Sequence, residues 1–281
     1  MTRLFALAFG LAVLLGLLGE ERGGAMMSSA TMLPGVTLKV VYNNYPGGEG
    51  LAADWGFGCV VESGDKLTLL DTGAKGPALM ANMQHMGIHP DDIAAVVLSH
   101  VHGDHTGGLD DFLKVNSRVT AFVPPSFPAR YTWGIERSGA RCVAARKGEP
   151  ILPGLWSTGE LGTGTKEQGL VAATADGLVV VSGCAHPGIV EMVRGSQQVA
   201  AELGLKSDDV ALVTGGFHML QMGDSQIRRI LDQLGALGVR RAAPSHCSGD
   251  RTRALFKEIL GARYLTGDLG SILTIGRPAT Q

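Results

Sequence analysis

The sequence predicts a single compact domain of mixed α/β structure, and three observations support this class. Apolar residues make up 45% of the 281 positions, enough to bury a substantial core. The 41 glycines and 12 prolines are too many for an all-helical bundle. Short apolar runs also alternate with amphipathic stretches in the second half of the chain, which is typical of strand-helix units.

The first predicted elements are antiparallel strands. Apolar and polar residues alternate over Val36–Tyr42, as they do in a strand. Two further strands, Cys59–Glu62 and Lys66–Leu70, are joined by the turn sequence Ser63-Gly64-Asp65. We therefore expect antiparallel pairing at the start of the domain.

A helix and a buried strand are expected next. Pro77–Met86 has helical spacing of its apolar residues, and Gly87 is expected to end the helix. Ile93–Leu98 is short and continuously apolar, which favours a buried strand. That strand leads the chain directly to His100.

The rest of the chain is predicted to alternate between strands and helices. The expected strands are Val119–Val123, Leu178–Val181, Val210–Thr214 and Val239–Ala243. The expected helices are Ile189–Leu203, Ser225–Leu237 and Arg251–Leu260. The stretch 124–165 is rich in Pro, Gly and Arg, so we expect it to form loops over a site.

The charge balance argues against a nucleic-acid partner. Lys and Arg total 24 against 26 Asp and Glu, and no long run of one sign interrupts the mixture. A nucleic-acid-binding domain usually shows a clustered excess of basic residues. A small-molecule partner is therefore expected.

Residues 1–30 are predicted to be a signal peptide or an N-terminal anchor, and residues 31–281 the folded domain. Arg3 precedes fifteen uncharged apolar residues, Leu4–Leu18. This run is shorter than the roughly 20 residues that span a bilayer, and the small residues Gly23/Ala25 and Ser28/Ala30 each offer a cleavage site. A periplasmic or secreted product is therefore expected.

Two other outcomes for the N-terminus stay open. An uncleaved leader would tether the protein to a membrane, and this is the only membrane contact that we expect. If the true start were Met26 or Met27, the product would be cytoplasmic. The oligomeric state is not determined by the sequence.

The strongest chemical signal is the run His100-Val101-His102-Gly103-Asp104-His105. In extended chain His100 and His102 point the same way, because side chains alternate with a period of two. Gly103 lets the backbone turn, so that Asp104 and His105 can face the same volume. Imidazole and carboxylate ligands that converge in this way suit Zn²⁺, with Fe or Mn as further candidates.

This run resembles the signature His-x-His-x-Asp-His of the metallo-β-lactamase superfamily. The resemblance extends from about residue 36 to residue 276 and includes Asp71-Thr72-Gly73. It implies an αββα sandwich with one or two metal ions at one edge of two packed sheets. His100 and His102 would bind one ion, and Asp104 and His105 the other.

Four further blocks are similar to one branch of the superfamily, the dihydropteroate-synthase-like or dihydropterin-(ribofuranosyl)aminobenzene-phosphate synthase branch. The blocks are Trp55-Gly56-Phe57, Ser182-Gly183-Cys184-Ala185-His186-Pro187-Gly188, Gly215-Gly216-Phe217-His218 and Pro244-Ser245-His246-Cys247. Their order along the chain makes chance agreement improbable.

His186 and His246 each follow a predicted strand, and we expect both to be metal ligands. Many members of the superfamily have a bridging Asp after the strand Leu178–Val181, whereas this chain has Cys184. A thiolate there could bind or bridge metal, and a small buried Cys is an equal alternative. The number of metal ions, one or two, therefore stays open.

Other residues receive supporting roles. Asp71 is interpreted as an acceptor for a metal-bound His, or as a possible ligand. His218 follows a strand in a Gly-rich turn, so proton transfer or anion binding is proposed for it, with a structural role as the alternative. Cys247 could pair with Cys184 in a disulfide, although sequence alone does not establish the distance. Four remaining residues are expected to be surface histidines or structural thiols: His85, His89, Cys59 and Cys142.

The expected function is metal-dependent hydrolysis of a small ester, amide, phosphoester or lactone by a metal-activated water, in which Asp104 could bind metal and orient the water. A pterin-pyrophosphate-dependent transferase, as the branch resemblance implies, is the first alternative. A metal-binding protein without turnover is the second. The sequence does not identify the substrate.

Overall fold

The structure is a computed structural model that describes residues 31–277. The leader predicted for residues 1–30 lies outside the described residues. Between residues 31 and 277, none of the helices has the length and apolar character needed to cross a bilayer.

Two β-sheets form the centre of the fold, one of seven strands and one of six. In spatial order the first sheet contains β13 (Ile272–Gly276), β1 (Gly35–Asn43), β2 (Phe57–Ser63), β3 (Lys66–Leu70), β4 (Ile93–Val97), β5 (Thr120–Val123) and β6 (Arg141–Ala144). The second contains β12 (Ala242–Ser245), β11 (Val210–Gly216), β10 (Gly177–Ser182), β9 (Leu170–Thr174), β8 (Leu155–Ser157) and β7 (Pro150–Leu152).

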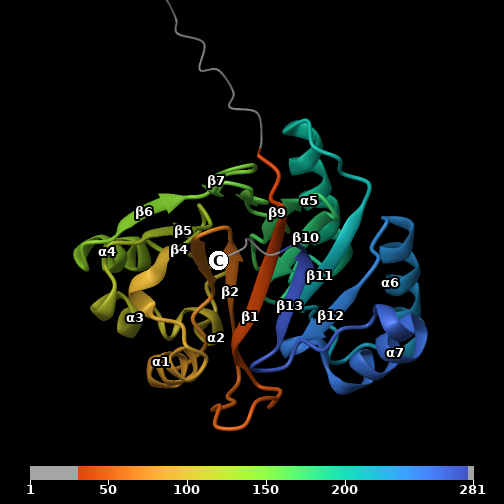
Figure 1. The fold of residues 1–281 in the computed structure, drawn as a ribbon, viewed down its shortest axis with the longest axis horizontal. Helices are drawn as coiled ribbons and strands as arrows, with labels where there is room; N and C mark the ends of the chain where they lie inside the picture. Colours follow the sequence, from red (N-terminus) through yellow and green to blue (C-terminus); the bar gives the residue numbers. More distant parts are fainter. Residues whose placement is uncertain (1–30, 278–281) are drawn as a thin grey trace, which may run out of the picture.

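Helices cover the outer face of each sheet (Figure 1). The first sheet carries α1 (Gly76–His85), α2 (Gly103–Thr106), α3 (Leu109–Val115) and α4 (Ala129–Arg137). The second carries α5 (Ile189–Glu202), α6 (Asp224–Ala236) and α7 (Asp250–Leu260). Single 3₁₀ turns occur at Pro90–Asp92, His246–Ser248 and Gly261–Arg263. The order helix, sheet, sheet, helix confirms the predicted αββα sandwich.

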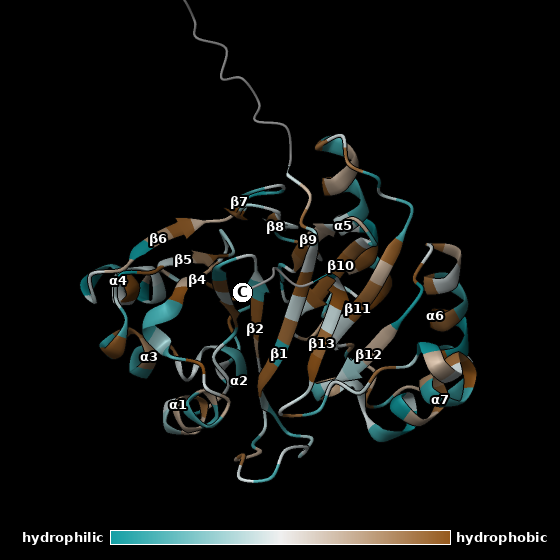
Figure 2. Cartoon of the chain, in the orientation of Figure 1, coloured by the Kyte–Doolittle hydropathy of each residue, from teal (hydrophilic) through white to brown (hydrophobic). Residues whose placement is uncertain are grey.

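Three apolar layers hold this sandwich together. Alternate residues of one strand point to opposite faces, so Val179 and Val181 of β10 pack between the sheets while Val180 packs under the helices. β4 is divided in the same way, with Val97 between the sheets and Val96 facing α1 and α3. Figure 2 shows the strands as largely hydrophobic ribbons inside helices of mixed character. Burial on both faces explains why these strands read as continuous apolar runs.

The strand directions bring the candidate site together. β1, β2 and β3 pair antiparallel, as predicted, whereas β3, β4 and β5 are parallel. In the second sheet β10, β11 and β12 are parallel, linked through α5 and α6. The carboxyl ends of β3, β4, β10, β11 and β12 therefore deliver the chain to the predicted site residues. Crevices at such strand ends are the usual place for ligands in α/β folds.

One stretch was predicted wrongly, and two strands were not predicted. Residues 124–165 form more than loops, because they contain α4, β6 and the antiparallel pair β7 and β8. These elements are short, and all but the buried β8 bury few of their residues, with Ile135 the buried member of α4. β9 and β13 were missed: β9 contains two alanines, which are poor strand formers, and β13 lies near the end of the chain.

Candidate metal centre

The six predicted ligands meet at one edge of the two sheets. His100 and His102 follow β4, and Asp104 and His105 lie on α2, the short helix that begins at Gly103. His186 comes from the turn between β10 and α5, and His246 begins the 3₁₀ turn after β12. Ligand candidates from both sheets therefore face one volume.

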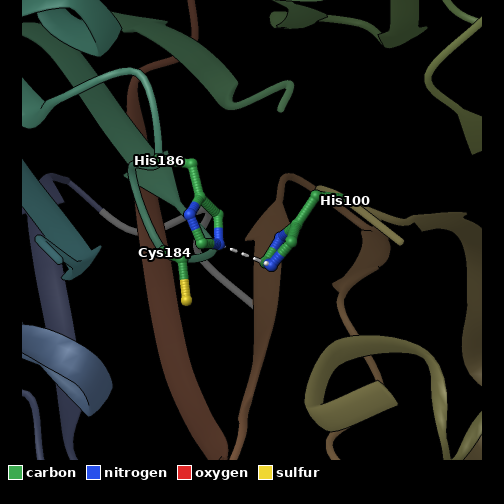
Figure 3. A group of neighbouring side chains, drawn as sticks. All are labelled: His100, Cys184 and His186. Atoms are coloured by element: carbon green, nitrogen blue, oxygen red, sulfur yellow. Dashed lines mark hydrogen bonds between the residues drawn. The ribbon is translucent and has the colours of Figure 1, made fainter. Parts of the chain in front are cut away.

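A first group of donors surrounds His100. Its Nε2 lies 3.1 Å from Nδ1 of His102 and 3.2 Å from Nε2 of His186. Figure 3 shows His186 and His100 pointing toward each other from facing elements, with the Cys184 sulfur beside them. One ligand atom each from His100, Cys184 and His186 lies within 4.8 Å of the others.

A second group lies beside the first and shares Cys184. Nε2 of His105 lies 3.2 Å from Sγ of Cys184 and 3.6 Å from Oδ2 of Asp104. Nε2 of His246 lies 3.3 Å from the same carboxylate oxygen. That nitrogen is buried, and between residues 31 and 277 it has no hydrogen-bond partner. A buried imidazole nitrogen without a partner is costly unless something else satisfies its lone pair.

Hydrogen bonds on the far side of each ring determine which nitrogen carries the proton. Asp71 is fully buried and accepts hydrogen bonds from the Ser99 N–H at 2.7 Å, the Ser99 hydroxyl at 2.6 Å and Nδ1 of His105 at 2.6 Å. Because the Ser99 hydroxyl donates to Asp71, it accepts from Nδ1 of His100 at 2.9 Å. Both rings are left with an unprotonated Nε2 directed into the site.

His246 is oriented in the same manner from another part of the chain. Its Nδ1 lies 2.8 Å from Oδ1 of Asn44, which leaves Nε2 unprotonated. The Trp55 ring stacks at a tilt over His246, with ring centroids 4.9 Å apart, and 47% of Trp55 is exposed. Ser99 and Asn44 are therefore part of the site although the sequence did not indicate them.

The backbone is strained at the site. Among the described residues, positive φ occurs at four non-glycine positions: Asp71, Ala185, His218 and His246. Each of them is a candidate site residue or the neighbour of one. Such conformations cost about 1–3 kcal/mol each and persist where the surrounding structure imposes them.

Glu167 supports the turn that carries Cys184 and His186, and the sequence analysis missed it. Its buried carboxylate accepts hydrogen bonds from the backbone N–H groups of Gly183, Cys184 and Ala185 at 2.9–3.0 Å, and from that of His186 at 2.8 Å. Burial raises the pKa of Glu167, and the N–H groups of His186, Ala185 and Cys184 oppose that rise. The only sequence signal is a charged residue just before the apolar run of β9.

The electrostatic environment favours the neutral forms of His100 and His186 and the ionised form of Asp104. For His105, burial lowers the pKa, but the adjacent Asp71 carboxylate outweighs burial and the pKa is raised. Burial, followed by the neighbouring imidazoles, lowers the pKa of His100, and the same causes lower that of His186 to about 4. For Asp104, burial raises the pKa, but the neighbouring imidazoles of His246 and His105 outweigh it, so the pKa is lowered. At neutral pH His100, His186 and Asp104 have the protonation states of metal ligands.

The two thiols of the site are close but not bonded. Sγ of Cys247 lies 3.3 Å from Sγ of Cys184, and both cysteines are free and buried. The contact raises the pKa of Cys184 and lowers that of Cys247, because one thiol donates to the other. The disulfide considered from the sequence is therefore absent between these two described residues.

His218 lies at the exposed rim. Its ring centroid is 4.3 Å from that of His186, so the side chain borders the first group of donors. The nearby segment 162–165, with His186 and Pro187, lines a cavity of about 260 Å³. A small molecule can therefore approach the site here. His85 and His89 are exposed, as expected, while Cys59 is buried and Cys142 partly buried.

Comparison with known proteins agrees with this fold and motif. The family model of the metallo-β-lactamase superfamily matches residues 59–184. A curated relative from Methanocaldococcus jannaschii, 7,8-dihydropterin-6-methyl-4-(β-D-ribofuranosyl)-aminobenzene-5'-phosphate synthase, is 30% identical over an alignment that covers 69% of this chain and 79% of the relative.

Two solved structures share the fold. One is described as a metal-dependent hydrolase of the β-lactamase superfamily, with a TM-score of 0.67, 23% identity and coverage of 86% of this chain and 100% of that one. The other, a metallo-β-lactamase fold protein from Bacillus subtilis, has a TM-score of 0.60, 16% identity and coverage of 85% and 99%. The sandwich, the histidine motif and the curated relative lead to one conclusion: this chain belongs to the metallo-β-lactamase superfamily, whose members generally bind metal ions.

Proposed function

We propose that the protein is a metal-dependent hydrolase that acts on a small ester, amide, phosphoester or lactone. One observation carries the proposal: imidazole nitrogens converge on one another and on a carboxylate. Nε2 of His105 and Nε2 of His246 lie 3.6 and 3.3 Å from Oδ2 of Asp104, and Nε2 of His100 lies 3.2 Å from Nε2 of His186. Lone pairs directed at one another repel unless a cation lies between them. The donor set therefore fits a bound metal ion.

The proposed ligands divide into two sets. His100, His102 and His186 would hold one ion, and Asp104, His105 and His246 a second. Cys184 lies within reach of both sets and is the candidate for a shared ligand, at the position where many relatives have Asp. The donor types suit Zn²⁺, and Fe or Mn are further candidates.

The bound metal would supply a water whose pKa is lowered toward about 7. Side chains of the protein would orient this water, fix the ligand tautomers and transfer protons. Asp104 could accept a hydrogen bond from the attacking water and orient it. Asp71 and Ser99 keep His105 and His100 in the required tautomers. His218, at the rim, can move a proton or bind an anionic group of the substrate, and Trp55 offers an exposed ring against which a substrate can pack.

A pterin-pyrophosphate transferase is the second candidate, because the curated relative is named a synthase. The metal site serves either reaction, since a cation stabilises a leaving pyrophosphate as well as an attacking hydroxide. If the protein is exported, as proposed below, hydrolysis is favoured over the transferase reaction. Pterin pyrophosphates are made in the cytoplasm and are too highly charged to cross a membrane unaided.

The assay that separates these functions uses metal-loaded protein and two sets of substrates. We expect measurable kcat/KM on at least one member of a phosphodiester, ester, amide and lactone panel, and no condensation of the two pterin-pathway substrates. His102→Ala, purified in parallel, controls for contaminating hydrolases. Efficient condensation without hydrolysis would assign the transferase, and no turnover of either kind would favour a binding protein.

We further propose that the chain is exported. The proposal rests on Arg3 and the apolar run Leu4–Leu18. Cell fractionation and N-terminal sequencing should find the protein outside the cytoplasm, with a start near residues 24–31. A cytosolic protein, whether it still carries residues 1–25 or begins at Met26 or Met27, would refute export. Because cleavage after Ala25 would also leave Met26 as the first residue, the compartment decides between export and a cytoplasmic start.

A further inference from the structure

Cys184, His218 and Cys247 form a third group of donors at the edge of the centre. One ligand atom of each lies within 4.8 Å of the other two. The two sulfurs are 3.3 Å apart, and neither thiol is in a disulfide. We propose that these three residues form a further metal position, selective for thiophilic ions such as Zn²⁺, Cd²⁺ or Cu⁺.

The sulfur separation is close to what a shared ion requires. Two thiolates that bind one tetrahedral Zn²⁺ at about 2.3 Å each stand roughly 3.7 Å apart. The two sulfurs, observed 3.3 Å apart, would therefore need to separate by only about 0.4 Å to bind one ion. A disulfide, in contrast, would need the sulfurs to approach to about 2.05 Å. The pair is closer to the geometry of a metal site than to that of a covalent bond.

The backbone directs all three side chains to this place. Cys184, His218 and Cys247 follow the carboxyl ends of the adjacent parallel strands β10, β11 and β12. His218 has φ of 51°, in the left-handed region that a side chain rarely adopts. A ring held there at an energetic cost is positioned by its surroundings rather than by its own preference.

Gly216 lies directly beside the two cysteines and has no side chain to collide with them. A Cβ atom at this position would lie 2.7 Å from Sγ of Cys247 and 3.0 Å from Cα of Cys184. The first contact is closer than a Cβ atom allows, and the second is at the tight limit. The absence of a side chain at Gly216 therefore creates the space in which the two thiols meet.

The donor chemistry determines the selectivity. Two sulfurs and one imidazole are soft or borderline ligands, which bind Zn²⁺ and Cu⁺ well and Mn²⁺ poorly. The other two groups, with three histidines or with Asp104 and two histidines, also suit harder ions. His218 is exposed, so an ion can enter from solvent on this side. When the position is empty, His218 stays free for the proton transfer proposed above.

The proposal does not depend on hydrolysis, and its test measures metal uptake. Metal-free protein is titrated with Cd²⁺ under reducing conditions, and the ultraviolet thiolate-to-cadmium charge-transfer band is followed. Cys247→Ser should bind one equivalent of Cd²⁺ fewer than the wild type, and its band should fall to about half because one of two thiolates is lost. The matched control is Cys142→Ser, which removes a partly buried thiol on β6. Its cadmium uptake and band intensity should equal those of the wild type.

Two further measurements make the result decisive. Mn²⁺ uptake should be the same in Cys247→Ser and wild type. His218→Ala, at an exposed position, should also lose the cadmium equivalent, whereas a residue used only for proton transfer would leave uptake unchanged. If Cys247→Ser does not fold by circular dichroism, His218→Ala alone decides. Cadmium uptake and band intensity equal to wild type in the folded variants would overturn the proposal, and a parallel loss of Mn²⁺ would overturn its selectivity.

Discussion

His102→Ala is expected to lose bound metal together with all measurable turnover. Nδ1 of His102 is 3.1 Å from Nε2 of His100, within the group of donors that His186 completes. Removal of a direct ligand should exceed the about 10–100-fold loss of affinity or activity that follows removal of a ligand's supporting partner. Elemental analysis of protein purified without chelator, together with kcat/KM on the best substrate, measures both quantities.

The matched control is His89→Ala. His89 is exposed and precedes β4, whereas His102 follows the carboxyl end of that strand, so His89 lies outside the donor groups. We expect wild-type metal content and activity for this variant. Because His102 is itself exposed, His102→Ala should also fold normally. Full metal content and activity in His102→Ala would therefore contradict the ligand role directly.

Asp71→Ala is expected to cause the largest loss of stability. Three donors, the Ser99 N–H, the Ser99 hydroxyl and Nδ1 of His105, would lose their acceptor in a fully buried place. At about 1–3 kcal/mol for each unsatisfied donor, the free energy of unfolding should fall by roughly 3–5 kcal/mol after partial relaxation. Urea unfolding of the metal-free protein measures this loss without interference from bound metal.

Asp71→Asn is the comparison that separates charge from shape. Asn has the same size and tolerates the positive φ of this position, 58°, but it offers only one acceptor oxygen. A smaller loss of stability and about 10–100-fold weaker metal binding are expected. If Asp71→Ala were as stable as wild type, the hydrogen bonds around Asp71 would not hold the site together.

The sequence predicted the central strands well because they are buried on both faces. β4 and β10 are continuous apolar runs, and they are too short to be buried helices. The helices α5, α6 and α7 were also predicted close to their observed bounds, because each has one apolar face. β6 and β7 were missed because short strands with exposed residues carry little periodic signal.

The candidate site was predictable where its residues are local. The motif from His100 to His105 can be recognised because four donors fall within six residues. Glu167 and Asn44 could not be found in this way. Glu167 contacts a turn 16–19 residues away, and Asn44 contacts His246 across 202 residues. Such contacts depend on the strand order, which a single sequence does not encode in any short pattern.

The metal ligands proposed here come from both sheets, and this has a mechanical consequence. His100 and His105 follow β4 of the seven-stranded sheet, whereas His186 and His246 follow β10 and β12 of the six-stranded one. An ion held between them would be a cross-link at the open edge of the sandwich, where no strand pairing joins the two halves among the described residues. Since such an ion binds only the folded chain, the resistance of the two halves to separation would rise with the concentration of free metal.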